Sequence, residues 1–232
     1  QNRKFTFIHW VIPSVLGTRL AEDLMSRDFK RIAFVTAEAS GALADTEGAV
    51  TALKKAGQGD RIVYNENFEQ KQTDFQSAVE RIRTKKADAV VVVLFPGAIA
   101  SFLKQAAQLQ LPSEILGMET FEDESEVKAS EGRLIGKRYV NAANPTKEFT
   151  EMYQKAWNEL PGWASGNSFD ALNLISKALQ SSRDPEGVRS FLANLKDYQG
   201  SIGTYSSSGD NRFLLPAAMK QVVKGGFIAS DK

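Results

Sequence analysis

The residues that could carry out chemistry are few and lie far apart in the chain. There is one histidine, His9, and no cysteine, which excludes disulfides, thiolate metal sites and cysteine nucleophiles. His9 has no second histidine, aspartate or serine at the spacing of a metal site or a catalytic triad. These residue types therefore predict neither a metal centre nor a histidine-dependent active site.

The densest group of carboxylates is the run Glu-Asp-Glu-Ser-Glu from Glu122 to Glu126. Two acids can divide acid and base roles only when their surroundings separate their pKa values, which requires an apolar setting for one of them. This run lacks such a setting, and a helix dipole favours acids in the first turn. We therefore expect it to be the solvated start of a helix.

Glycine-rich turns, which hold phosphates in the nucleotide enzymes built on α/β sheets, are not found in this chain. The turns at residues 37–42 and 95–98 match neither the dinucleotide-binding nor the P-loop pattern. A nucleophile-elbow motif following a strand is not present either. We expect a protein that is not an enzyme and uses no cofactor.

A different kind of site is indicated where a buried strand ends. Residues 89–94 form an unbroken apolar run, as a strand buried on both faces requires. A Pro-Gly step follows, after which apolar residues recur at helical spacing. Ligands of parallel sheets bind at the carboxyl ends of strands, which is where Phe95, Pro96 and Gly97 fall.

The elements that would position this edge alternate between strand and helix, which predicts an α/β fold with a doubly wound parallel sheet. Strands are expected at residues 32–36, 61–64, 89–94 and 114–118, with helices at 14–27, 44–55, 74–83 and after 97. Helices dominate beyond residue 121. They are expected at 146–158, 168–180 and 185–195, after a strand at 134–140 and a linker at 141–145.

The composition of the 232 residues is that of a globular protein, with 42% apolar and 25% charged residues. A chain of this length forms one large domain or two small ones. The net charge of +1 gives no reason to expect nucleic acid or an anionic membrane surface as a partner. No apolar run approaches the roughly 18 residues of a membrane span.

The order and spacing of several short motifs resemble those of the type I periplasmic binding proteins, in particular the branched-chain amino-acid (Leu/Ile/Val-binding) branch that serves ABC transporters. The motifs are Lys30-Arg-Ile-Ala-Phe-Val, Ser40-Gly41, Leu53-Lys-Lys-Ala-Gly57, Thr73-Asp-Phe75, Asp88-Ala-Val, Gly117-Met-Glu119, Phe169-Asp-Ala171 and Gly203-Thr-Tyr-Ser-Ser-Ser-Gly-Asp210. Together they cover nearly the whole chain.

The resemblance implies two α/β lobes that close on a small solute by hinge motion, with much of the N-terminal lobe lacking here. The C-terminal lobe would comprise residues 9–139 and 214–232. Residues 1–8 and 140–213 would be a remnant of the N-terminal lobe, mainly helices. The implied function is solute binding for an ABC importer, with an amino acid as the leading solute and an ABC permease as a partner.

The implied location is periplasmic or extracellular, with a lipid anchor as one option. A ligand-sensing receptor or a regulator domain of the same fold is the alternative function. A permease and an ATPase encoded beside this chain would favour transport, whereas a fused kinase or cyclase would favour sensing.

The resemblance also suggests which residues contact the solute. Glu119 matches the acid that binds a solute ammonium group, and Phe95, followed by Pro96, matches an aromatic residue lining the pocket. Ser40 and Gly41 fall where many relatives have Tyr-Gly, so a hydroxyl replaces one aromatic wall. Structural roles compete with these assignments, because Glu119 could be a first-turn acid, Phe95 a core residue and Ser40 a helix N-cap.

Two further residues have similarly open roles. Trp10, beside the first crossing between the implied lobes, could stack on a ligand or anchor a hinge. Asp170 follows Phe169 at the expected start of a helix, where capping would explain it.

The helices between residues 146 and 195 carry more apolar surface than water tolerates. Burial of one large apolar side chain stabilises a protein by roughly 1.5–3 kcal/mol, so leaving several exposed is costly. We expect a partner to cover these helices: a second copy, a swapped element or a separately encoded lobe. The apolar residues concerned are Phe149, Tyr153, Trp157, Phe169, Leu172, Ile175 and Leu179.

Overall fold

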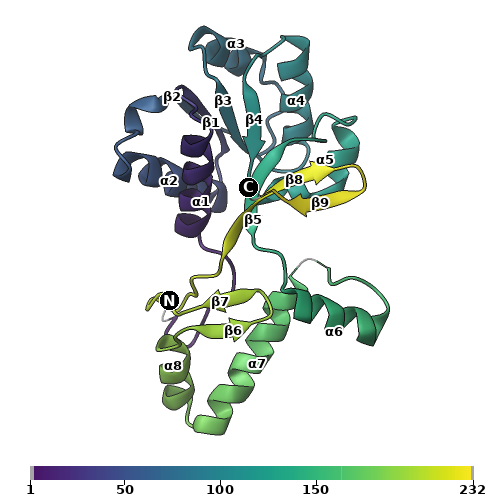
Figure 1. Cartoon of the computed structure of the whole chain (residues 1–232). Helices are drawn as coiled ribbons and strands as arrows, with labels where there is room; N and C mark the ends of the chain where they lie inside the picture. Colours follow the sequence, from purple (N-terminus) through teal and green to yellow (C-terminus); the bar gives the residue numbers. More distant parts are fainter. Residues whose placement is uncertain (1–2, 163, 231–232) are drawn as a thin grey trace. The chain divides into compact units, whose positions relative to one another are not determined.

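The computed structural model describes residues 3–162 and 164–230 and divides into two compact units (Figure 1). Unit 1 comprises Gln1–Val15 and Ala142–Ala217, and unit 2 comprises Leu16–Asn141 and Ala218–Lys232. Each unit is therefore assembled from separate stretches of the chain. It stays a prediction that the two units correspond to the two lobes that close on a solute, with the boundaries expected above.

Unit 2 is built on a seven-stranded sheet with the order β2-β1-β3-β4-β5-β8-β9. Strands β2, β1, β3, β4 and β5 pair in parallel, which confirms the doubly wound sheet. At the end of the chain, β8 and β9 form an antiparallel hairpin that turns at Gly225. The strands are β1 (Ile32–Ala37), β2 (Ile62–Phe68), β3 (Ala89–Val93), β4 (Glu114–Gly117), β5 (Arg138–Ala142), β8 (Ala217–Val223) and β9 (Gly226–Ala229).

Helices cover both faces of this sheet, with α1 and α2 on one side and α3 and α4 on the other (Figure 1). Every residue of β1 and β3 is buried, which accounts for their unbroken apolar sequences. The elements are α1 (Pro13–Ser26), α2 (Ser40–Lys55), α3 (Gln76–Thr84), α4 (Ala98–Gln108), α5 (Glu124–Ala129) and the 3-10 turns η1 (Gly59–Arg61) and η2 (Glu119–Glu122).

Two boundaries in unit 2 differ from the sequence-based expectation. Helix α2 begins at Ser40 rather than at residue 44, because the small residues of the expected loop continue the helix. Strand β5 begins four residues later than expected. Gly132 and Gly136 have φ angles of +83° and +86°, so the residues between them form turns rather than an extended strand.

Unit 1 contains three helices and a two-stranded antiparallel sheet among its described residues. The three helices were expected, although α7 begins three residues earlier than the pattern suggested. The run at residues 5–12 forms only one isolated bridge, between Ile8 and Arg212. The elements are α6 (Lys147–Trp157), α7 (Ser165–Ser181), α8 (Pro185–Ala193), β6 (Tyr198–Gly200) and β7 (Gly203–Tyr205).

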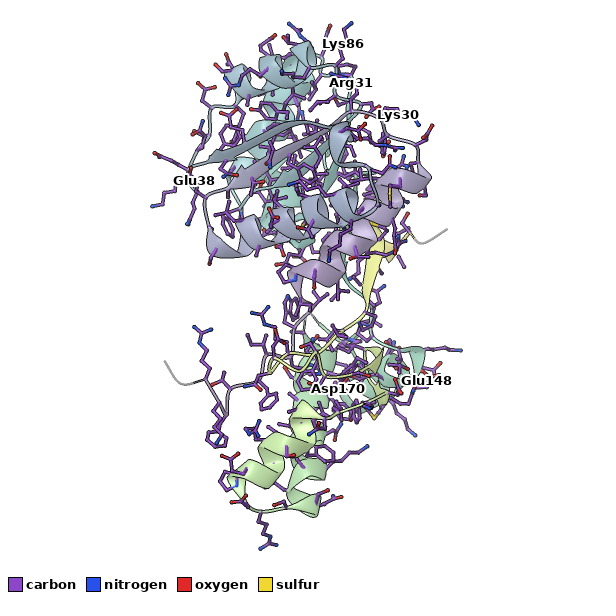
Figure 2. The ribbon with its side chains drawn as sticks, turned by 90° about the vertical axis from the view of Figure 1, so that its left-hand side faces the viewer. Lys30, Arg31, Glu38, Lys86, Glu148 and Asp170 are labelled. Carbon is purple, nitrogen blue, oxygen red and sulfur yellow. The ribbon has the colours of Figure 1, made fainter. Side chains whose placement is uncertain are left out.

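Asp170 is a buried residue inside α7 in unit 1 (Figure 2). The expectation that Asp170 caps a helix is therefore wrong. Its side chain is 1% exposed and accepts hydrogen bonds from the Ser201 amide at 2.8 Å and the Tyr205 hydroxyl at 3.0 Å. The Tyr205 hydroxyl is also 2.8 Å from His9 Nε2, so this network ties the start of the chain to β7.

None of the helices in the described part of the chain has the length and apolar character needed to cross a membrane.

Candidate functional site

The carboxyl ends of three neighbouring strands in unit 2 stand at one level. Thr36 of β1 pairs with Val93 of β3, and Val92 pairs with Gly117 of β4. The segments that follow these strands therefore begin side by side along one edge of the sheet. Open parallel sheets bind ligands at such edges, so we call this row the carboxyl edge.

Five of the six predicted contact residues lie along the carboxyl edge. Ser40 and Gly41 follow β1, Phe95 and Pro96 follow β3, and Glu119 follows β4. The sixth, Trp10, belongs to unit 1 and is half-buried there. The role of all six in ligand contact stays a prediction.

Ser40 is the first residue of α2 and is exposed. The N-cap position is occupied by Ala39, which supplies no side-chain hydrogen bond, so the N-cap interpretation of Ser40 is wrong. The Ser40 hydroxyl makes no hydrogen bond to other described residues. A Cβ atom added at Gly41 would meet nothing within 4 Å, so space remains open beside this helix start.

Phe95 is half-buried, and Pro96 and Gly97 are exposed. The Phe95 carbonyl accepts a hydrogen bond from the Ala98 amide at 3.1 Å, which closes the turn into α4. Gly97 has a φ angle of +94°, a conformation that side-chain-bearing residues rarely adopt. The Pro-Gly step therefore ends the strand as expected and leaves part of the Phe95 ring accessible.

Asp45 is a residue of this edge that the sequence reasoning missed. It lies on the buried stripe of α2, and the hydroxyl of the next residue, Thr46, is 2.7 Å from the hydroxyl of Thr36 at the end of β1. The signal was an acid among small and apolar residues at helical spacing. Among the described residues, its carboxylate makes no hydrogen bond and no ion pair, although it is only 9% exposed.

The electrostatic character of the carboxyl edge follows from Asp45 and Glu119. Burial, reinforced by the negative charge of Glu119, raises the pKa of Asp45 to about 7. Glu119, the first residue of η2, is half-buried. Two carboxylates in a partly desolvated setting favour a cationic group over an anionic one.

The acidic run that follows Glu119 is not uniformly solvated, contrary to expectation. Glu126 is 2% exposed and accepts hydrogen bonds from the amides of Gly97 and Ala100. Glu122 lies 2.9 Å from the buried Lys220 ammonium group. Asp123 is the N-cap of α5, and only the two residues after it are exposed.

A polar groove lies beside the end of β2, with a volume of about 380 Å³. Its lining includes Glu38, Glu69 and an ion pair in which the Arg81 guanidinium lies 2.8 Å from Glu66. Figure 2 shows Glu38 apart from Lys30, Arg31 and Lys86, which precede β1 and β3. The described residues include no group of three or more His, Asp or Glu side chains that could hold a metal ion.

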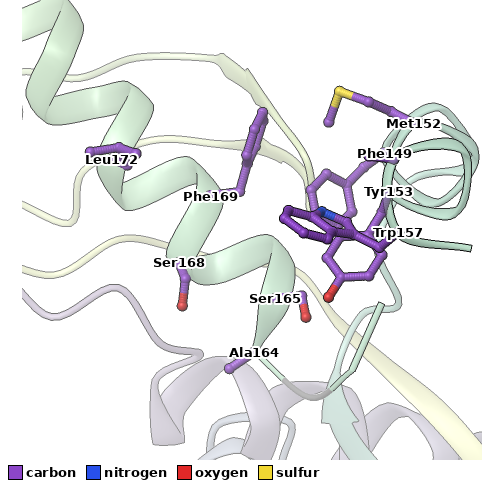
Figure 3. Close-up of a pocket in the computed structure, with 10 residues that line it drawn as sticks. Phe149, Met152, Tyr153, Trp157, Ala164, Ser165, Ser168, Phe169 and Leu172 are labelled. Atoms are coloured by element: carbon purple, nitrogen blue, oxygen red, sulfur yellow. The ribbon is translucent and has the colours of Figure 1, made fainter. Parts of the chain in front are cut away.

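The second candidate surface is an open apolar groove between α6 and α7 in unit 1 (Figure 3). Figure 3 shows the rings of Phe149, Tyr153 and Trp157 on α6 beside Phe169 of α7. The Phe149 and Phe169 ring centres are 5.2 Å apart. The groove has a volume of about 600 Å³, and Met152, Ala156, Ala164, Ser165, Ser168 and Leu172 complete its lining.

Most of the apolar residues on α6 and α7 are exposed. This agrees with the expectation that these helices carry more apolar surface than the chain itself covers. Trp157 and Leu172 are each 69% exposed, and Phe169, Ile175 and Leu179 are between 40% and 47% exposed. Two of the seven differ, because Phe149 is buried and Tyr153 is half-buried within unit 1. We call the exposed set the α6–α7 face.

Comparison with known families identifies the chain. A family model described as periplasmic binding protein matches residues 2–226. The chain therefore belongs to the periplasmic binding protein family, which confirms the resemblance drawn from its motifs.

Solved structures share the fold at low sequence identity. A leucine-binding protein from Thermotoga maritima is 18% identical with a TM-score of 0.81, and the match covers 100% of this chain and 68% of that one. The branched-chain amino acid transporter substrate-binding protein from Streptococcus pneumoniae, in complex with isoleucine, is 21% identical with a TM-score of 0.73. That match covers 95% of this chain and 66% of that one. A solute-binding protein of an ABC transporter from R. palustris, in complex with benzoate, is 17% identical with a TM-score of 0.75. Here the match covers 96% of this chain and 64% of that one. The chain thus spans about two thirds of the length of these proteins.

Proposed function

We propose that this protein is a solute-binding component of an ABC importer and acts in the periplasm or outside the cell. The observation that carries the proposal is the family match over residues 2–226. The row of polar and aromatic residues along the carboxyl edge supports it, because that edge is where open parallel sheets bind small molecules. Solute binding by hinge closure would deliver the solute to an ABC permease.

The solute class that the carboxyl edge favours is an amino acid. The structural neighbours include one bound to isoleucine and one bound to benzoate, so both a zwitterion and an aromatic anion are ligands of this fold. Glu119 and Asp45 would repel the carboxylate of benzoate and attract an ammonium group. Phe95 would contact the apolar part of the solute.

Nuclear magnetic resonance titrations with L-isoleucine, L-leucine and benzoate test this proposal. We expect the two amino acids to bind this chain weakly and to shift the amide resonances of residues 95–97 and 119–120 at millimolar concentration, and benzoate to shift them less. Equal shifts from benzoate would contradict the amino-acid assignment. No shift from any of the three would contradict binding of these solutes by this chain alone.

The variant Glu119→Gln tests the proposed ammonium contact. We expect at least about tenfold weaker binding of L-isoleucine, because an ammonium group would lose its charged partner in a partly buried site. Glu124→Gln is the matched control, since Glu124 is an exposed acid on the following helix. Unchanged affinity in the Glu119 variant would remove this residue from the site.

We also propose that a polypeptide covers the α6–α7 face. Its five side chains are between 40% and 69% exposed, so covering them would contribute roughly 4–8 kcal/mol, which is a large share of the stability of a whole domain. The helices of unit 2 show the usual solution, because their apolar stripes are buried against a seven-stranded sheet. A second copy, a swapped element or a separately encoded lobe could supply the cover.

A further inference from the structure

The side chain of Glu126 is a buried carboxylate whose hydrogen bonds all lead to another helix. It projects from α5 and is 2% exposed. Its Oε1 accepts the Gly97 amide, and its Oε2 accepts the Ala100 amide at 2.7 Å. Both amides belong to the start of α4, so Glu126 caps a helix that precedes its own in the chain.

The start of α4 needs this partner. The first amides of a helix have no carbonyl to bind within the helix, and the N-cap residue normally supplies a side chain. Here the N-cap is Gly97, which has no side chain, and its φ angle of +94° disfavours a replacement that has one. The carboxylate of Glu126 therefore takes the role that the N-cap residue cannot fill.

The carboxylate in turn needs the helix. A buried charge is costly unless hydrogen bonds or an opposite charge compensate it. Within the described residues, Glu126 forms no ion pair, so the two amides and the positive end of the α4 dipole provide the compensation. Removal of the carboxylate would thus leave the two amides without an acceptor, and removal of the amides would leave the carboxylate buried without a donor.

The contact connects two segments of the carboxyl edge. The α4 start is the turn that carries Phe95, and α5 directly follows the η2 turn that begins with Glu119. Among the described residues, Glu126 is the only side chain from outside α4 that bonds to the amides of residues 97–100.

We propose that Glu126 is a positioning residue that holds the turn at residues 95–97 and the segment at residues 119–122 in one fixed geometry. Its effect on ligand binding rests on the proposed function, because that function assigns Phe95 and Glu119 to the solute. The structural connection between these two segments does not depend on the proposed function.

Amide hydrogen exchange tests the connection without any ligand. In Glu126→Gln, one acceptor oxygen is replaced by a donor that faces an amide N–H, at nearly constant size. We expect exchange at Gly97 and Ala100 to accelerate at least about tenfold, since a charge-assisted hydrogen bond is lost. Exchange at residues 119–122 should accelerate as well, and Glu124→Gln on the same helix should change neither segment.

Two outcomes of this experiment would overturn the connection. One is unchanged exchange at Gly97 and Ala100 in the Glu126 variant. The other is equal acceleration of every amide in unit 2, which would show a general loss of stability. A urea unfolding curve of the same variant distinguishes local opening from global unfolding.

Titration with L-isoleucine tests the consequence for binding. We expect Glu126→Gln to weaken binding several-fold, although Glu126 would not touch the solute, and Glu124→Gln to bind as the natural protein does. Altered exchange with unaltered affinity would overturn the positioning role. If the natural protein binds no amino acid, the proposed function fails, and exchange at residues 119–122 alone decides whether the two segments are coupled.

Discussion

At the scale of single residues, four carboxylates are buried in the described part of the chain: Asp23, which pairs with Arg138, and Asp45, Glu126 and Asp170, whose surroundings differ. Asp170 accepts hydrogen bonds from a backbone amide and a tyrosine hydroxyl, and Glu126 accepts two helix amides. Asp45 has no such partner among the described residues. A buried acid that is left uncompensated lowers stability, and such acids are typical of functional sites.

Replacement of Asp45 by asparagine should stabilise the protein at neutral pH. The pKa of Asp45 is raised from its ordinary value of 3.8 to about 7, so the folded state holds a proton that the unfolded state has lost. Stability should therefore fall as the pH rises from about 4 to about 7. The shift corresponds to at most ~4 kcal/mol, and we expect ~1–2 kcal/mol after structural relaxation.

Urea unfolding at pH 4 and pH 8 measures this effect. Asp45→Asn should exceed the natural protein in stability at pH 8 and match it at pH 4. Glu38→Gln is the control, because Glu38 is an exposed acid at the same edge. A variant that is less stable at both pH values would mean that the Asp45 carboxylate is paired in the folded state.

The sequence predicts the location of a residue in the fold well when that residue directly follows a strand with a clear apolar pattern. Phe95 and Glu119 follow apolar runs whose burial fixes the strands, so their location at the carboxyl edge could be predicted. The burial of Glu126 could not, because it depends on a contact between two helices about thirty residues apart. Its neighbours in the chain are polar, and so the local pattern indicated solvent.

Strands and helices, at the next scale, were predictable to within a few residues. Strands β1 and β3 have unbroken apolar sequences because both faces are buried, and this pattern has few alternatives. The start of α2 was less certain, since alanine, serine and glycine are compatible with both a loop and a helix start. The turns at Gly132 and Gly136 depend on backbone angles that the apolar pattern does not encode.

The α6–α7 face should make the chain associate. We expect oligomers at micromolar concentration by light scattering, because the exposed apolar side chains gain contacts on association. Leu172→Ser should reduce the association, and Leu214→Ser is the control, since Leu214 is 46% exposed but lies outside this face. A monomer at low micromolar concentration would contradict the prediction that a partner covers α6 and α7.

At the scale of the whole molecule, the family could be predicted from ordered motifs because the match extends over nearly the entire chain. The solute could not, because relatives of this fold bind chemically different ligands. The chain also spans only about two thirds of those relatives.

The assembly of each unit from separate stretches affects how the protein would respond to a protease. Unit 1 requires residues 1–15 as well as 142–217, and unit 2 requires its final stretch as well as residues 16–141. A single cut near residue 142 would yield two pieces that each hold part of both units. The halves should therefore copurify under native conditions and separate only in denaturant, and they could be expressed as two genes and recombined.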